Sequence, residues 1–190
     1  HRDPTAAILA SPRRKAPEHS PGTPPMTDGG RGGAMLIRPV MTAEAALLAA
    51  LHAACFEKGH LPTPRNAWDE TAMAQFVAGP SMLCLLASLA TPELRPVGFL
   101  IARAAVDEAE LLTIGILREY RERGVGQALM QQAAGTLRAS GILRLFLEVD
   151  ETNAHALALY RSMGAEPVGH RPGYYENDRN AAVMRLVLES

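Results

Sequence analysis

Apolar and polar residues alternate along this chain with two different periods, which predict an order of helices and strands. Stretches with apolar residues three or four positions apart predict four helices, which begin near Thr42, Trp68, Gly124 and Asn153. Short apolar runs bounded by Gly, Pro or polar residues predict strands at 36–39, 81–88, 97–105, 110–117, 143–149, 168–170 and 182–188. The order β-α-α-β-β-β-α-β-α-β-β and the length of 190 residues favour a single α/β domain.

Residues that end helices support this order. Thr42 is placed to cap the first helix, and Asn153 is placed to cap the fourth. Gly164 has the position of a left-handed residue that ends the fourth helix. The strand at 143–149 is apolar apart from two charged residues, which is typical of a strand covered on both faces.

The first 34 residues differ in kind from the rest. They hold 6 of the 14 prolines and 5 of the 16 glycines, and they lack a sustained apolar period. Such a segment buries too little surface to offset its ordering entropy. We therefore expect residues 1–34 to be a disordered tail and residues 35–190 to be the folded domain.

Composition argues against several classes of function. The net charge is −1, and residues 35–190 hold 14 basic and 17 acidic residues, so a basic face for nucleic acid is not expected. No apolar run approaches the length of a membrane span. Cys55 and Cys84 lie in apolar surroundings that favour packing, and none of the six histidines has the spacing of metal ligands. We expect a cytoplasmic protein, a monomer or weak homodimer, without metal, membrane or nucleic-acid partners.

The most informative motif is Arg-Glu-Arg-Gly-Val-Gly-Gln at 121–127, between a predicted strand and the third helix. Paired glycines at such a turn let backbone N–H groups approach an anion, and the helix N-terminus adds its positive dipole. Cationic side chains are disfavoured there without a ligand, so Arg121 and Arg123 favour a bound phosphate. A helix start with glycines and no ligand remains the alternative.

Two other nucleotide sites fit this turn less well. A Walker loop would end in Gly-Lys-Ser/Thr, whereas this turn continues Gly-Gln-Ala. A dinucleotide fingerprint would have a third glycine where Leu129 stands, although Glu148 has the spacing of the ribose-binding acid.

Two segments follow the turn in order, Leu-Arg-Leu-Phe-Leu-Glu-Val at 143–149 and Asn-Ala-His-Ala-Leu-Ala-Leu-Tyr-Arg-Ser-Met-Gly at 153–164. Together with the turn they resemble the acetyl-CoA-binding core of the GCN5-related N-acetyltransferase (GNAT) superfamily. Within it, residues 35–188 look most like the RimI-type ribosomal-protein-alanine N-acetyltransferases. The resemblance implies an α/β (α+β) fold with a mixed sheet of six to seven strands, splayed at its centre and flanked by four helices.

The same resemblance implies acetyl-CoA as co-substrate. The turn would clasp its pyrophosphate, and the strand before the turn would pair with the pantetheine arm, with the Ile116 amide as oxyanion donor. Gly115 has a competing explanation as a β-bulge residue. The expected cofactor-binding residues are Ile114, Gly115, Ile116, Arg121, Glu122, Arg123, Gly124, Val125, Gly126, Gln127 and Asn153.

Acetyl transfer to an amine needs a base for the amine and a proton for the departing thiolate. Glu148 is our candidate base, because an acid in an apolar strand is costly unless it has a function. Its alternative is a structural glutamate that reaches solvent or pairs with an arginine. Tyr160 is our candidate acid, with simple core packing as its alternative. Both assignments follow from the resemblance.

The acceptor is less well defined by the sequence. Glu108, at a strand edge, is either a contact for a cationic acceptor or a solvated residue. Tyr174 and Tyr175 match a tyrosine pair that lines a peptide channel in RimI-type enzymes. Phe56 and Trp68 are separated by a longer Pro-rich loop than that family has, which leaves the acceptor open. The hypotheses are an acetyltransferase for a protein N-terminus, one for a small amine such as a polyamine or aminoglycoside, and a non-catalytic acyl-CoA-binding module.

Overall fold

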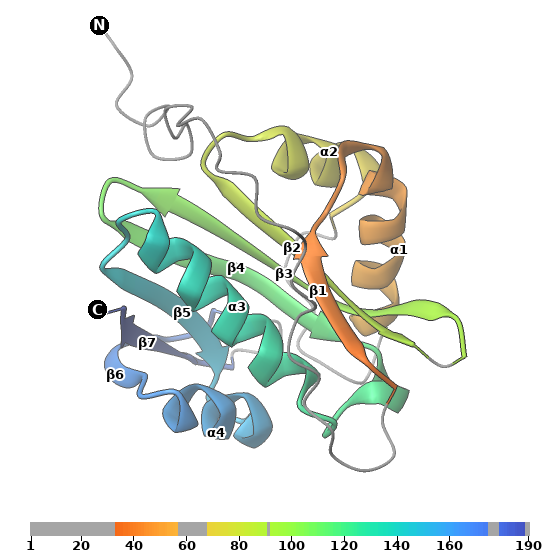
Figure 1. Ribbon diagram of the computed structural model, residues 1–190. Helices are drawn as coiled ribbons and strands as arrows, with labels where there is room; N and C mark the ends of the chain where they lie inside the picture. The colour runs from red at the N-terminus through yellow and green to blue at the C-terminus, as the bar shows by residue number, and fades with distance from the viewer. Residues whose placement is uncertain (1–32, 57–67, 91, 175–178, 189–190) are drawn as a thin grey trace, which may run out of the picture.

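Seven strands form one mixed sheet with helices on both faces (Figure 1). The structure is a computed structural model, and it describes residues 33–56, 68–90, 92–174 and 179–188. The strands are β1 (Met35–Pro39), β2 (Met82–Ala90), β3 (Leu94–Ala105), β4 (Glu108–Ile116), β5 (Arg144–Asp150), β6 (Glu166–Arg171) and β7 (Ala181–Val187). The helices are α1 (Ala45–Cys55), α2 (Glu70–Ala78), α3 (Val125–Ala139) and α4 (Ala154–Ser162), with short 3-10 turns at Thr42–Glu44 and Arg118–Tyr120. The predicted order of elements is confirmed, while the predicted tail and the Pro-rich loop at 57–67 lie outside the described residues, apart from Gly33 and Ala34.

Local capping was predicted correctly at one helix and wrongly at another. The Asn153 side chain accepts a hydrogen bond from the Ala156 N–H at 3.1 Å, and Gly164 has φ +90 just after α4. Thr42, by contrast, does not cap α1. Glu44 holds this turn instead, because its carboxylate binds the Arg38 guanidinium at 2.6 and 2.8 Å and accepts from the Met41 N–H at 2.8 Å.

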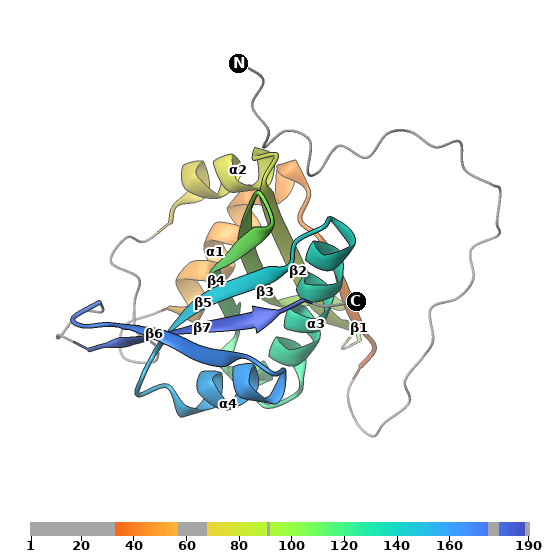
Figure 2. The same cartoon turned by 90° about the vertical axis from the view of Figure 1, so that its left-hand side faces the viewer.

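The sheet separates two hydrophobic cores. Figure 2 shows α1 and α2 on one side of the sheet and α3 and α4 on the other. We call the face covered by α3 and α4 the α3 face; its core includes Leu100, Leu129 and Leu147. The opposite face, covered by α1 and α2, is the α1 face; its core includes Leu48 and Phe99. The two helix pairs thus bury opposite sides of the same strands, as the fully apolar strands required.

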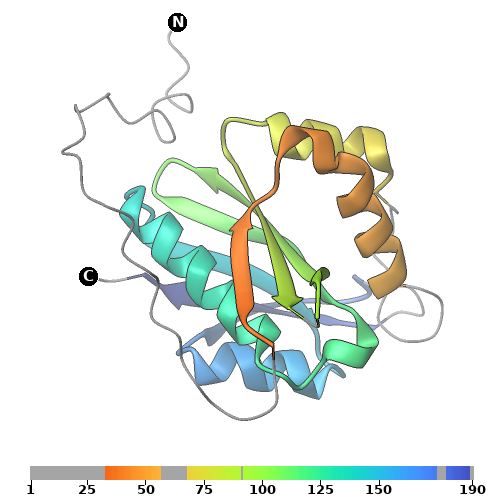
Figure 3. The same ribbon diagram turned by 45° about the vertical axis from the view of Figure 1, so that its right-hand side comes forward.

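The strand order is β1-β2-β3-β4-β5-β7-β6, and only β4 and β5 run parallel to each other. Figure 3 shows β1 (orange) at one edge of the sheet, with the chain passing from it into α1. The parallel pairing joins residues 108–111 of β4 to residues 144–147 of β5 and then stops. Residues 112–116 of β4 and 148–150 of β5 have no pairing with each other, so the sheet is splayed at its centre as the resemblance implied.

We call the gap between the unpaired parts of β4 and β5 the splay. A β-bulge in β4 determines which side chains line it. The register passes from Thr113 opposite Ile101 directly to Leu111 opposite Ala102, so Leu112 is the extra residue. The bulge is therefore at Leu112, and the alternative explanation of Gly115 as a bulge residue is wrong. Because the extra residue shifts the alternation of side chains, Leu111 and Ile114 both pack on the α3 face.

Gly115 has a packing reason instead. A Cβ atom at this position would lie 2.6 Å from Phe99 Cε1 and 3.0 Å from Cys55 Cβ. The absence of a side chain lets the Phe99 ring and helix α1 lie directly against β4.

We expect Gly115→Ala to lower the free energy of unfolding by about 1–3 kcal/mol, because the added methyl overpacks the Phe99 ring. Urea denaturation would measure the change. Gly135→Ala is the matched control, since a Cβ there meets nothing within 4 Å and alanine in the middle of α3 should add about 0.5–1 kcal/mol. Equal destabilisation by both substitutions would contradict the packing argument.

Candidate active site

The turn between β4 and α3 has a backbone suited to binding an anion. Glu122 has φ +60 and Gly124 has φ +79, so two residues of the turn are left-handed. Such turns direct successive N–H groups into one concavity, and a left-handed residue other than glycine carries strain of the kind that collects at functional sites. Gly124 precedes the helix as its N-cap residue rather than starting it as predicted, and α3 begins at Val125.

The first amides of α3 point out of the helix. Its first internal hydrogen bond runs from the Ala128 N–H to the Gly124 carbonyl at 3.0 Å, and no side chain caps the helix. The N–H groups of Val125, Gly126 and Gln127 therefore have no acceptor within α3. Together with the helix dipole they form a site that fits a phosphate.

Two glycines shape this site in different ways. A Cβ atom on Gly126 would lie 3.3 Å from Leu159 Cδ2 and 3.4 Å from Ile116 Cδ1, so Gly126 lets α3 approach β4 and α4 closely. A Cβ atom on Gly124 would meet nothing within 4 Å. The space beside Gly124 is thus open.

The charged side chains of the turn have partners within the protein. The Arg121 Nε donates to the Ile116 carbonyl at 3.1 Å, and the Arg123 guanidinium lies 5.3 Å from the centre of the Tyr120 ring. The Glu122 carboxylate lies 3.8 Å from His155 Nε2, with both side chains exposed. Arg121 is therefore held against the backbone of β4, directly beside the splay.

Strand β4 directs backbone groups of Ile114 and Ile116 into the splay, although the Ile116 carbonyl is occupied by Arg121. The Leu117 N–H donates to the Val97 carbonyl at 2.9 Å, which directs Leu117 toward β3. Because residues of an antiparallel pair alternate in the direction of their backbone groups, Ile116 and Ile114 direct theirs away from β3, toward β5. A pantetheine-binding edge at Ile114 and Ile116 stays a prediction, and Gly115 directs its backbone groups to β3.

Glu148 lies on the other side of the splay. Leu147 and Val149 belong to the α3-face core, so Glu148 points to the α1 face. Its side chain is 15% exposed, and its carboxylate lies 2.9 Å from Arg171 Nε. Pairing with an arginine is the alternative that the sequence left open for Glu148, and the structure shows this pair.

Tyr174 completes this group. Its hydroxyl donates a hydrogen bond to the Glu148 carboxylate, and the Arg171 guanidinium lies 5.8 Å from the centre of its ring. Burial, followed by this hydrogen bond and the Glu148 charge, raises the pKa of Tyr174. Tyr175 lies outside the described residues.

Tyr160 approaches the splay from the opposite face. It is 4% exposed in the α3-face core, and its hydroxyl has no hydrogen-bond partner among the residues that the structure describes. Burial raises the pKa of this hydroxyl. Glu148 and Tyr160 therefore lie on opposite faces of the sheet, so a molecule can contact both only through the gap between β4 and β5.

Glu108 is separated from this group. It lies opposite Arg144 in the paired part of the sheet and forms an ion pair with that residue at 3.5 Å. Glu148 is four residues beyond Arg144, about 13 Å along the strand. Glu110 lies nearer and contributes to the field at Tyr174, although it also pairs with Arg103 at 2.8 Å.

The sequence analysis missed an ionic network that anchors the β6–β7 hairpin. Asp150, only 1% exposed, accepts from the Thr152 N–H and hydroxyl at 2.8 and 2.7 Å, and its other oxygen lies 3.1 Å from Arg179 Nη1. His170 contacts Glu151 at 2.5 Å. The acid two residues after Glu148 was a signal for this network, but its partners are distant in the chain.

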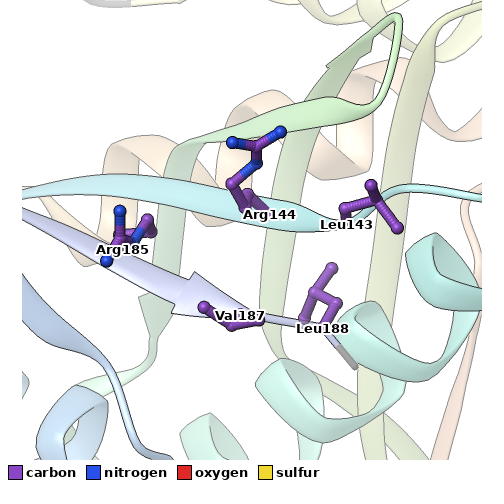
Figure 4. A pocket seen from close by; sticks show the side chains of 5 residues that line it. All are labelled: Leu143, Arg144, Arg185, Val187 and Leu188. Carbon is purple, nitrogen blue, oxygen red and sulfur yellow. The ribbon is translucent and has the colours of Figure 1, made fainter. Parts of the chain in front are cut away.

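A separate cavity of about 290 Å³ lies at the beginning of β5 (Figure 4). Its lining residues are Leu143, Arg144, Arg185, Val187 and Leu188. It opens beside Arg144, on the level of Glu108, and so lies away from the splay. It is not part of the candidate active site.

We expect Glu148→Gln to lower the pKa of Tyr174, because the substitution removes the charge that favours the protonated phenol while the burial remains. Absorbance titration of the phenolate band would measure the shift. A Tyr174→Phe protein identifies which tyrosine has changed. An unchanged titration would show that the hydrogen bond to Glu148 does not form in solution.

The described residues contain neither a membrane-spanning helix nor a metal-binding cluster. No helix in this part of the chain is long and apolar enough to cross a membrane. No group of three or more His, Cys, Asp or Glu side chains there is arranged to hold a metal ion.

Comparison with known proteins adds the family. The sequence pattern of the acetyltransferase (GNAT) family matches residues 46–165. The [ribosomal protein bS18]-alanine N-acetyltransferase of Salmonella typhimurium is 33% identical over 101 residues, which are 52% of this chain and 68% of that protein. Its counterpart from Escherichia coli K12 is 35% identical over 93 residues, 47% of this chain and 63% of that protein. The alignments thus span about two thirds of the length of these curated relatives.

Solved structures agree with this assignment. The crystal structure of the ribosomal-protein-S18-alanine N-acetyltransferase from Escherichia coli superposes with a TM-score of 0.69 at 26% identity, covering 83% of this chain and 96% of that one. An acetyltransferase from Salmonella typhimurium, solved with its cofactor acetyl-CoA, has the same fold with a TM-score of 0.69 at 16% identity, over 83% and 96%. The chain described here therefore belongs to the acetyltransferase (GNAT) family and is an acyltransferase.

Proposed function

We propose that this protein transfers the acetyl group of acetyl-CoA to the N-terminal α-amine of a protein whose first residue is alanine. One observation carries the proposal: β4 and β5 stop pairing after Leu111 and Leu147, with Tyr160 in the core on one face of the sheet and Glu148, paired with Arg171, on the other. The relatives that act on the alanine of ribosomal protein bS18 supply the acceptor class.

We call the turn at 121–127, with the first amides of α3, the anion cradle. It would hold the nucleotide end of acetyl-CoA. Its amides at Val125, Gly126 and Gln127 suit the pyrophosphate, with Arg121 and Arg123 beside them. Asn153 already uses its side-chain oxygen as a helix cap, which leaves its amide group for the CoA arm.

Strand β4 would align the other end of the co-substrate. The outward backbone groups of Ile114 and the Ile116 N–H suit the amides of the pantetheine arm, which would then lie along the unpaired edge as an added strand. The Ile116 N–H, directed into the gap, is the proposed donor to the oxyanion.

Glu148 would accept a proton from the amine, and Tyr160 would donate a proton to the departing sulfur. An α-amine is largely protonated at neutral pH, so it needs a base before it can attack, and Glu148 is the acid that faces the acceptor side. Tyr160, buried on the CoA side, would give its proton to the sulfur as the thioester bond breaks. The raised pKa of Tyr160 keeps the phenol protonated before that step.

The test is acetyl-CoA turnover with two kinds of acceptor. One is a peptide beginning with alanine, with the same peptide already acetylated at its N-terminus as control; the other is a panel of polyamines and aminoglycosides. We expect turnover of the free peptide alone. Turnover of the panel alone would assign a small-amine acceptor, and CoA binding without any turnover would favour a non-catalytic module.

A further inference from the structure

The ion pair between Glu148 and Arg171 conflicts with a simple role for Glu148 as a base. A base for an ammonium group must meet that cation, yet the carboxylate is already occupied by a guanidinium at 2.9 Å. We propose that Arg171 is a displaceable counterion, which the cationic amine of the acceptor replaces at Glu148. This inference rests on the proposed function, and it makes Arg171 a positioning residue that favours acceptors entering as cations.

The register of the sheet explains why Arg171 reaches Glu148. Arg171 ends β6 opposite Ala181, and Ala181 lies opposite Asp150 on β5. Arg171, Asp150 and Glu148 therefore share the α1 face. The hairpin is tied to the end of β5 by the contact of His170 with Glu151 and of Arg179 with Asp150.

Glu148 and Arg171 differ in burial, and therefore in the cost of losing the ion pair between them. Glu148 is 15% exposed, so a carboxylate there without a partner would be costly. Arg171 is 59% exposed and can extend into solvent. The Arg171 guanidinium carbon also lies 5.8 Å from the centre of the Tyr174 ring. Because the arginine is the exposed partner, a second cation can take its place at Glu148 without leaving the carboxylate unpaired.

The two other acids near Glu148 on this face, Asp150 and Glu110, have partners of their own. Asp150 pairs with Arg179 on the hairpin, and Glu110 pairs with Arg103 on β3. Arg185 lies on β7 opposite Phe146, which is two residues before Glu148 on β5. It forms no ion pair among the described residues. Arg171 is thus the cation that holds Glu148 while the acceptor is absent.

The exchange accounts for each proton in the transfer. The acceptor ammonium takes the place of Arg171 and gives a proton to Glu148; the nitrogen then bonds to the acetyl carbon as the carbon–sulfur bond breaks. The thiolate takes a proton from Tyr160, and the amide nitrogen loses its second proton to solvent, as does Glu148 afterwards. Tyr160 takes one proton back from solvent, so that one net proton is released per acetyl group transferred. The acetylated product is neutral, so Arg171 can pair with Glu148 again, which favours product release.

The test is steady-state kinetics of Arg171→Gln with the alanine peptide. We expect the KM for the peptide to fall about three- to five-fold with kcat unchanged, because a competing cation has been removed and the reacting groups remain. The KM for acetyl-CoA should not change. Arg185→Gln, on the same face of the sheet, is the matched control and should keep the original peptide KM.

A second measurement uses guanidinium itself. Millimolar guanidinium chloride should compete with the peptide in Arg171→Gln, because it can occupy the vacated position, and should compete much less in the unsubstituted enzyme. Arg171→Met, which keeps the aliphatic stem over Tyr174, replaces the glutamine variant if thermal unfolding shows that the latter is destabilised.

The outcomes separate this inference from the proposed function. Turnover of the peptide by the unsubstituted enzyme, together with an unchanged or raised peptide KM in folded Arg171→Gln, would overturn the counterion role and leave the function standing. Loss of fold in both Arg171 variants would assign a structural role and also overturn it. Absence of peptide turnover by the unsubstituted enzyme would overturn both.

Discussion

We expect Glu148→Gln to lower kcat at neutral pH by about 10²- to 10⁴-fold while acetyl-CoA still binds, which is the range that a positioned general base contributes. Glutamine keeps the size of the side chain and a hydrogen-bond acceptor for Tyr174 but cannot take a proton from the amine. Because the anion cradle lies at the start of α3, away from β5, the affinity for CoA should be unaffected. Single-turnover kinetics with the alanine peptide and calorimetric titration with CoA would measure the two effects.

The matched control for this substitution is Glu166→Gln. Glu166 is exposed at the start of β6, far along the strand from Arg171, so the same loss of charge there should leave kcat unchanged. If Glu148→Gln retains full turnover, Glu148 is a structural partner of Arg171 and another group or water acts as the base.

Tyr160→Phe should lower kcat about 10²-fold with little change in stability. The phenol is the proposed source of the proton for the thiolate, so its loss affects the step in which the carbon–sulfur bond breaks. The hydroxyl has no partner among the described residues, and removing a buried polar group without a partner costs the fold little or even stabilises it. Activity per folded molecule and urea denaturation should be measured on the same preparation.

A contrary pattern would identify a packing role for Tyr160. Reduced stability with equal activity per folded molecule would mean that the tyrosine only fills the α3-face core. In that case the thiolate would be protonated by solvent, and the resemblance would have misled us about this residue.

Much of the fold was predictable because its signals are local. The strands at 82–90 and 144–150 are buried runs, so their apolar composition is enough to identify them. The Asn153 cap and the Gly164 helix end involve neighbours within a few residues, and both were predicted. Thr42 failed as a cap because a neighbouring strand supplies Arg38, whose ion pair with Glu44 organises the turn instead.

The same difference between local and long-range interactions decides which parts of the candidate site could be predicted. The cradle at 121–127 could be predicted since one continuous segment supplies its amides. The bulge at Leu112 and the contact of Gly115 with Phe99 could not, because they depend on the register between β3 and β4. The pairing of Glu148 with Arg171 depends on three strands meeting in the order β5-β7-β6.

The sequence by itself determined the order of elements, the anion-binding turn and the position of Glu148 as the one acid in the apolar strand at 143–149. These are properties of segments whose interactions are short in range. The tertiary structure alone decided that Glu148 has a counterion, that Glu108 lies with Arg144, and that Glu148 and Tyr160 approach one gap from opposite faces. Such facts depend on strand register and on which face each side chain takes, and a single register shift would reverse them.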